Sequence, residues 1–220
     1  MGALDNPGYI MEMLAIWAVP VIMAITFHEA AHGYVANKFG DPTALMLGRI
    51  TLNPIKHIDL FGTILMPALL VVMGLPALGY AKPVPVNFRN IKPFKLGTIL
   101  VAAAGPLMNL FLVVCSLLVI VFAAQFPPHI AEFPIKMAWA SVQINTVIMI
   151  FNMLPIPPLD GSRILSVLLP PRLAIPYDKL EPYGMWIVLL LVISGLMFQV
   201  LNPLIQLTLR VAHDFLKLFL

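Results

Sequence analysis

The residues in this sequence best suited to chemistry are two histidines and a glutamate in the stretch His28-Glu29-Ala30-Ala31-His32. On a helix, histidines four residues apart lie one turn apart on the same face, so both imidazoles can reach one metal ion. Imidazole nitrogens are common zinc ligands. Glu29 adjoins the first histidine and can act there as a general base on a water molecule. This HExxH spacing is typical of zinc metalloproteases and predicts zinc-dependent hydrolysis.

A catalytic zinc usually has three protein ligands and one open position. The metzincin form of the motif, with a further glycine and histidine, is excluded because those positions hold Val35 and Lys38. Asp160 is the best third ligand, since it follows a proline-rich break and a carboxylate at membrane depth is costly unless it is paired or metal-bound. We therefore assign one Zn²⁺ per chain to His28, His32 and Asp160. The other aspartates after the motif are interpreted as turn, linker or interfacial residues: Asp41, Asp59, Asp178 and Asp214.

Other polar residues lie in apolar segments and have open interpretations. An amide donor near the zinc would stabilise the oxyanion formed during hydrolysis. Asn152 is the first candidate for this substrate-binding role, because it precedes Asp160 by eight residues, and Asn109 is the second. Asn145 is interpreted as a hydrogen-bonding residue between helices. His57 is either a surface histidine in a polar linker or a ligand of the zinc or a second metal.

The elements that must position these residues are mostly apolar helices. Residues 9–38 read as one long helix that carries HEAAH and stops at Gly40-Asp41-Pro42. Residues 43–53 are too short for a membrane span and predict a short strand or hairpin near the membrane surface. Residues 61–80 are apolar but interrupted by prolines and glycine, which predicts a broken span or a re-entrant loop. Two prolines predict an extended segment at 80–86.

Further spans are predicted at 98–126, 135–154 and 183–200, and residues 204–220 either extend the last span or form an amphipathic surface helix. The expected fold is an all-α polytopic membrane protein. It has about five or six transmembrane or re-entrant helices and a short membrane-embedded or interfacial β element. Residues 1–220 form a single membrane-embedded metalloprotease domain.

The composition independently indicates a membrane protein. The 220 residues are 60% hydrophobic and only 10% charged, whereas soluble domains average about 25% charged residues. The net charge of +3 fits basic loops at a lipid surface, and no basic run with interleaved aromatics indicates nucleic acid. A single cysteine, Cys115, excludes an intrachain disulfide and the cysteine zinc sites. No basic region precedes the first apolar segment, so it is expected to stay as a span.

Three motifs together resemble the site-2 protease family of intramembrane zinc metalloproteases: HEAAH at 28–32, AGPLMN at 104–109 and FNMLPIPPLDG at 151–161. The segments GDPTA at 40–44, GRITLNPIKHID at 49–59 and AKPVPVN at 81–87 are similar to its small prokaryotic members. Those members lack the PDZ and cystathionine-synthase-type regulatory domains. The resemblance extends from about residue 24 to 163.

The resemblance implies zinc held by His28, His32 and Asp160, with Glu29 as the base and Asn152 in contact with substrate. It implies membrane-spanning protein substrates that are unwound before they are cut, in the lipid bilayer of a prokaryotic plasma membrane. An oligomer is not predicted. The alternative is an ion or metal transporter that uses the same cluster, since broken helices with ionisable residues also mark ion paths. Against it, the chain has no repeated halves, and metal transport needs no base between two ligands.

Overall fold

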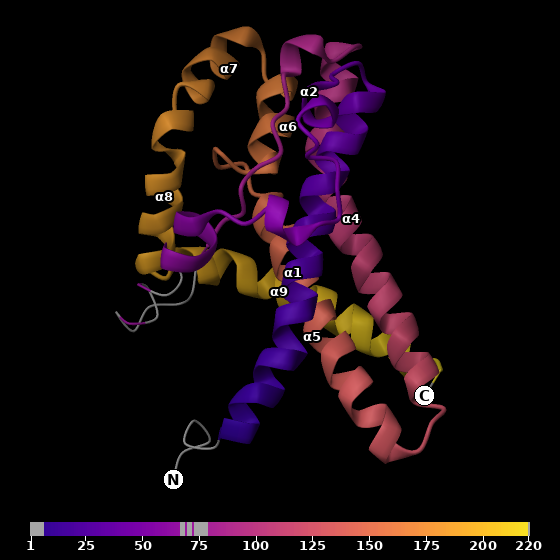
Figure 1. The fold of residues 1–220 in the computed structure, drawn as a ribbon. Helices are drawn as coiled ribbons and strands as arrows, with labels where there is room; N and C mark the ends of the chain where they lie inside the picture. The colour runs from indigo at the N-terminus through magenta and orange to yellow at the C-terminus, as the bar shows by residue number, and fades with distance from the viewer. Residues whose placement is uncertain (1–6, 67–68, 70–71, 73–78, 220) are drawn as a thin grey trace.

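The computed structural model describes residues 7–66, 69, 72 and 79–219, and all of its regular elements are helical. Three long helices, α1, α4 and α5, pack against one another, and α9 passes back across them (Figure 1). In chain order the helices and helical turns are α1 (Pro7–Lys38), α2 (Thr43–Met46), η2 (Pro54–Lys56), η3 (Leu60–Leu65), η4 (Phe88–Asn90), α4 (Phe94–Ala123), α5 (Pro128–Asn152), α6 (Asp160–Leu168), α7 (Pro171–Asp178), α8 (Glu181–Ile193) and α9 (Leu196–Leu216).

The three long helices have the length and apolar character needed to cross a membrane. A helix rises about 1.5 Å per residue, so 20 apolar residues span a hydrocarbon core of about 30 Å. Large apolar side chains such as Leu118 and Phe122 of α4 face outward, where lipid would cover them. The buried core between α4, α5 and α9 includes Val113, Val142 and Ala212. The prediction of a helical protein with apolar helices long enough to span a membrane is confirmed.

The C-terminal region differs from the predicted span at 183–200. Gly195 adopts a left-handed backbone with φ of +76°, which ends α8 and starts α9. The two helices meet at an angle of 79°. They form either one broken span or a re-entrant pair, so the described residues contain three candidate spans, or four if this pair counts as one. The predicted span at 183–200 is therefore not one continuous helix, because the glycine inside the apolar run breaks it.

The predicted β element at 43–53 is also wrong for this structure. Residues Thr43–Met46 form the single helical turn α2, and Gly48, with φ of +62°, turns the chain after it. The part of the chain that the structure describes contains no strand. The partial alternation of apolar residues was a weak signal because a four-residue turn can produce it as well. Half of the segment at 61–80 that was predicted to be a broken span or a re-entrant loop, residues 67–68, 70–71 and 73–78, lies outside the described residues.

The first helix ends where the sequence predicts. Gly40 has φ of +101°, a conformation that glycine adopts without steric cost. Asp41 follows it and is fully buried. Its carboxylate accepts hydrogen bonds from the Thr43 hydroxyl at 2.5 Å, the Asn87 backbone amide at 2.7 Å and the Asn90 side chain at 3.0 Å. Asp41 therefore fastens the segment that precedes α4 to the end of α1.

Burial disfavours the charged form of Asp41, but hydrogen bonds from Thr43 and Asn90 and from a backbone amide outweigh it and hold the pKa of the carboxyl below its ordinary value. A lowered folded-state pKa stabilises the fold above the unfolded pKa, and this stabilisation is lost as the pH falls through the folded pKa. We expect Asp41→Ala to destabilise the protein at pH 7 by about 1–3 kcal/mol, because it leaves buried donors unpaired.

Thermal unfolding in detergent at several pH values measures this effect. The difference in melting temperature between wild type and Asp41→Ala should be largest near pH 7. It should begin to narrow below about pH 4, the pKa of an unfolded aspartate, and should be lost only as the pH falls through the lower pKa of the folded carboxyl. Asp178→Ala, at an exposed position, serves as the control and should change little. An equal difference at pH 7 and in acid would contradict the electrostatic account.

Candidate metal centre

The long first helix brings His28 and His32 together. They lie one turn apart on α1, and their Nε2 atoms are 3.1 Å from each other. Both residues are buried, with 5% and 8% of their surface exposed. Two imidazole nitrogens this close in an apolar helix bundle have no bulk water to bind, so they need a shared partner.

Asp160 is that partner, and it lies far from the two histidines in the sequence. It is the first residue of α6, which follows the proline-rich break after α5. Its Oδ2 atom lies 3.3 Å from Nε2 of His28 and 3.4 Å from Nε2 of His32. The next residue, Gly161, packs so tightly that a Cβ there would lie 2.1 Å from the Met153 carbonyl oxygen. The glycine thus lets α6 approach the end of α5 and places the carboxylate beside the histidines.

The outer nitrogens of the two imidazoles have fixed partners. Nδ1 of His28 lies 2.6 Å from Oδ1 of Asn109, and Nδ1 of His32 lies 2.7 Å from the backbone oxygen of Val101. A backbone carbonyl only accepts hydrogen bonds, so Nδ1 of His32 carries a proton, and in the neutral imidazole Nε2 then has a lone pair. The same holds for His28 as long as Asn109 presents its oxygen. Such outer contacts orient metal-ligating histidines.

The inner atoms of the cluster therefore carry only lone pairs. Oδ2 of Asp160 is buried and has no hydrogen-bond partner among the described residues. Three lone-pair atoms that face one another within 3.4 Å repel unless a cation lies between them. Tetrahedral zinc with bonds of about 2.0–2.2 Å separates its ligand atoms by about 3.3–3.6 Å. The donor types and separations of His28, His32 and Asp160 fit a zinc ion, and the three residues could hold one.

Gly105 of α4 completes this space. A Cβ at position 105 would lie 2.4 Å from Nε2 of His32 and 2.5 Å from Nε2 of His28. Any larger residue would displace the imidazoles, so the glycine in the AGPLMN segment keeps the inner side of the cluster open. The sequence analysis used this segment only for the family resemblance and did not predict the role of Gly105.

Glu29 lies beside the cluster and is half-buried. Its Oε2 atom accepts a hydrogen bond of 2.7 Å from the backbone amide of Val84. Val84 stands between Pro83 and Pro85, which have no amide hydrogen, so it is the only donor of that three-residue run. Oε1 has no hydrogen bond among the described residues and stays available to receive a proton.

The remaining candidates lie outside the cluster. The amide nitrogen of Asn152 donates to the Ile148 carbonyl oxygen, one turn earlier on α5. Asn109 is fully buried. Its nitrogen donates to the Ala24 carbonyl and to Asn145, so both of its hydrogens are engaged. These contacts favour a role for Asn109 in holding His28, while the oxyanion role of Asn152 stays a prediction.

His57 is buried, with 2% exposure, so its interpretation as a surface histidine was wrong. Its Nε2 atom donates to the Thr51 carbonyl oxygen, and its own carbonyl accepts from the Lys82 amide. It therefore fastens the loop after α2 to the segment that leads to Val84, and it does not belong to the cluster. The sequence reading missed the roles of Val84 and Val101, because both act through backbone atoms that residue type does not reveal.

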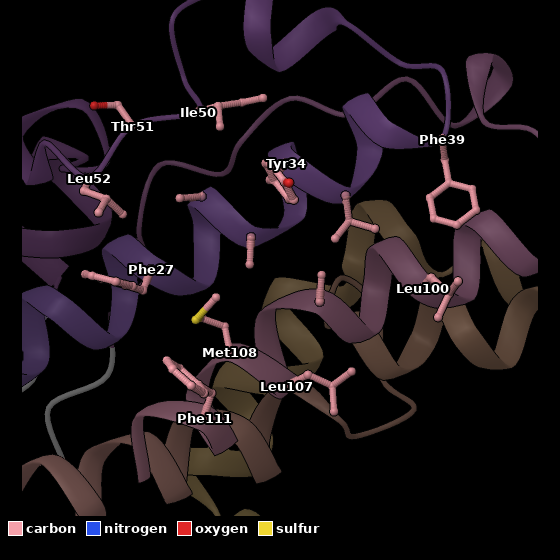
Figure 2. A pocket seen from close by; sticks show the side chains of 14 residues that line it. Phe27, Tyr34, Phe39, Ile50, Thr51, Leu52, Leu100, Leu107, Met108 and Phe111 are labelled. Carbon is pink, nitrogen blue, oxygen red and sulfur yellow. The ribbon is translucent and has the colours of Figure 1, made fainter. Parts of the chain in front are cut away.

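The structure also has an apolar pocket of about 750 Å³, whose lining includes sequence neighbours of His28 and His32. It lies between α1 and α4 and under residues 50–52 (Figure 2). Ala31, which precedes His32, and Ala104, which precedes Gly105, form part of its wall. Larger side chains line the rest, among them Phe27, Tyr34, Leu107 and Phe111. The pocket can therefore receive an apolar group beside residues that neighbour His32 on α1 and Gly105 on α4.

No protein-family model matches the chain, and no solved structure matches it significantly. Curated proteins do match it, among them the three that follow. YwhC of Bacillus subtilis, which its name describes as a zinc metalloprotease, is 41% identical over 206 residues, covering 90% of this chain and 89% of YwhC. Rip2 of Mycolicibacterium smegmatis, also named a zinc metalloprotease, is 28% identical over 87% of this chain and 70% of its own length. Rip2 of Mycobacterium tuberculosis strain Erdman is 30% identical over 77% of this chain and 61% of its own length.

The similarity to YwhC extends over nearly the full length of both chains. It agrees with the resemblance in the motifs and with the convergence of His28, His32 and Asp160. The chain belongs to the site-2 protease family of zinc metalloproteases.

Proposed function

We propose that this protein is an intramembrane zinc metalloendopeptidase that hydrolyses peptide bonds within the membrane-spanning segments of other proteins. The observation that carries the proposal is the buried cluster of His28, His32 and Asp160 in a bundle of apolar helices. Glu29 lies next to it on α1. The names of the relatives support a protease rather than the transporter alternative.

His28, His32 and Asp160 would hold the zinc ion. When bound, zinc supplies Lewis-acid polarisation of the scissile carbonyl and activation of a water molecule. Glu29 then takes the proton of the attacking water on Oε1, while the Val84 amide holds Oε2 in place. The same carboxyl passes the proton to the departing amine. Asn152 would donate to the oxyanion after its side chain leaves the Ile148 carbonyl.

The apolar pocket supports a membrane-spanning substrate. Its lining has few polar groups, so a charged or polar side chain there would lose its hydration without replacement. An apolar side chain of a membrane-spanning helix has no such hydration to lose. The pocket would thus receive the apolar side chains that flank the scissile bond.

Purified protein in liposomes, mixed with a panel of synthetic single-span peptides, tests the proposal. Each peptide has about 20 apolar residues, and half of the panel carries a central helix-breaking Gly-Pro pair. We expect mass spectrometry to find cuts inside the apolar stretch, mainly in the broken peptides, and no cuts after zinc is removed with a chelator. No cleavage of any peptide, or cleavage only in the polar flanks, would contradict the proposal.

A photo-crosslinking residue at position 107 or 118 shows where the substrate lies. Leu107 lines the pocket, and Leu118 lies 11 residues further along α4, about 16 Å away. The two side chains are 57% and 54% exposed, so they are matched in access to the bilayer. We expect the same peptides to crosslink at 107 and weakly at 118. Equal crosslinking at both positions would indicate lipid-like contact and no specific binding.

A further inference from the structure

A chain of hydrogen bonds between buried polar side chains connects the metal cluster to the interface between α4 and α5. Oδ1 of Asn109 faces His28, and Nδ2 of Asn109 donates to Oδ1 of Asn145 at 2.8 Å. Nδ2 of Asn145 in turn donates to the Ser141 carbonyl oxygen at 2.9 Å. Asn109 and Asn145 are 0% and 1% exposed. Neither amide can exchange its partners with bulk water.

Two backbone carbonyls fix the orientation of the two side-chain amides in this hydrogen-bond chain. The Ala24 carbonyl accepts from Nδ2 of Asn109 at 3.2 Å, and the Ser141 carbonyl accepts from Nδ2 of Asn145. Because a carbonyl oxygen cannot donate, each amide must turn its nitrogen toward it. Asn145 then presents its oxygen to Asn109. Asn109 has both hydrogens engaged and presents its own oxygen to His28.

The direction matters for the metal ligand. With Oδ1 of Asn109 as the partner, Nδ1 of His28 carries the proton, and Nε2 presents a lone pair to the cluster. If the Asn109 amide were reversed, its NH₂ group would face Nδ1, and the proton of a neutral His28 would move to Nε2. That nitrogen could then no longer bind a metal. His32 has no such ambiguity, because Val101 offers it a backbone oxygen.

We propose that Asn145 is a positioning residue for the metal centre: it holds the Asn109 amide in the one orientation that makes His28 a metal ligand. This inference rests on the proposed zinc site. Asn145 has no hydrogen bond to His28, His32 or Asp160 among the described residues, and it acts only through Asn109. The simpler interpretation, a hydrogen bond that joins two helices, predicts a loss of stability on mutation but no specific loss of zinc affinity.

Zinc affinity in detergent, measured by competition with a chromophoric chelator, separates the two interpretations. Loss of an outer-shell partner typically weakens metal binding about 10–100-fold. We expect a loss in this range for Asn109→Ala and about 10-fold for Asn145→Leu. Combined with Asn109→Ala, the change Asn145→Leu should cause no further loss, because the residue through which it acts is gone. Gln143→Leu, the same type of change on a half-buried residue of α5, is the control and should not change affinity.

Asn145→Asp provides the rescue. Its side chain keeps an oxygen for Nδ2 of Asn109, and in its protonated form the carboxyl can donate to the Ser141 carbonyl in place of Nδ2. Zinc affinity should therefore stay close to that of wild type. A further loss from Asn145→Leu in the Asn109→Ala background would overturn the inference. So would an unchanged affinity for Asn145→Leu, whatever its melting temperature. A wild type that binds no zinc would overturn the proposed function as well, which distinguishes the two failures.

Discussion

Replacing Asp160 by alanine should remove zinc from the purified protein. The carboxylate is the only acidic group among the described residues that lies with His28 and His32 in the metal cluster. Without it, two imidazoles are left to bind the ion. Loss of an outer-shell contact already costs about 10–100-fold in affinity, so we expect loss of a direct ligand to exceed about 100-fold. Wild-type protein should hold about one zinc per chain, and the variant nearly none.

Metal analysis of protein purified without chelators measures this result. Asp178→Ala, an exposed aspartate of α7, is the matched control and should keep its zinc. Gly105→Ala gives a second test at a residue that is no ligand, because its Cβ would lie within 2.5 Å of both Nε2 atoms. Alanine favours a helix more than glycine does, so a loss of zinc there cannot come from a weaker α4. Full occupancy in Asp160→Ala would mean that another residue is the third ligand.

The local features of this chain could be predicted from its sequence because each depends on neighbouring residues. The end of α1 follows from Gly40, whose positive φ only glycine adopts readily. The spacing of His28 and His32 follows from helix geometry. Their convergence with Asp160, 128 residues after His32 in sequence, needed a chemical argument: a carboxylate in an apolar setting requires a cation. The structure brings these three residues together.

The features that could not be predicted depend on tertiary contacts. The turn at Gly195 looks in sequence like one glycine within a span, and only its backbone conformation reveals the 79° bend. The burial of His57 follows from its bond to the Thr51 carbonyl. The amide of Val84 reaches Glu29 across 55 residues. Backbone groups are the same in every residue, so sequence patterns do not show which of them will bind a side chain.

Replacing Glu29 by glutamine should abolish most proteolysis and leave zinc in place. Glutamine keeps an oxygen that can accept the hydrogen bond from the Val84 amide, so the local structure should persist. It cannot take a proton from water at neutral pH. Positioned general acid–base groups contribute about 100- to 10,000-fold to a rate, and we expect cleavage of a single-span peptide in liposomes to fall within that range. Zinc content should stay near one per chain, since Glu29 is not in the cluster.

The control is Glu12→Gln, the same change on the same helix at an exposed residue that pairs with Lys136. Its cleavage rate should match the wild type. The pair of measurements separates two roles of Glu29, because a structural role through Val84 would survive the change to glutamine, whereas a role as base would not. A Glu29→Gln protein that keeps its zinc and cleaves at the wild-type rate would exclude Glu29 as the base. A protein that loses zinc together with activity would instead indicate that Glu29 maintains the metal centre, and the base would have to be sought elsewhere.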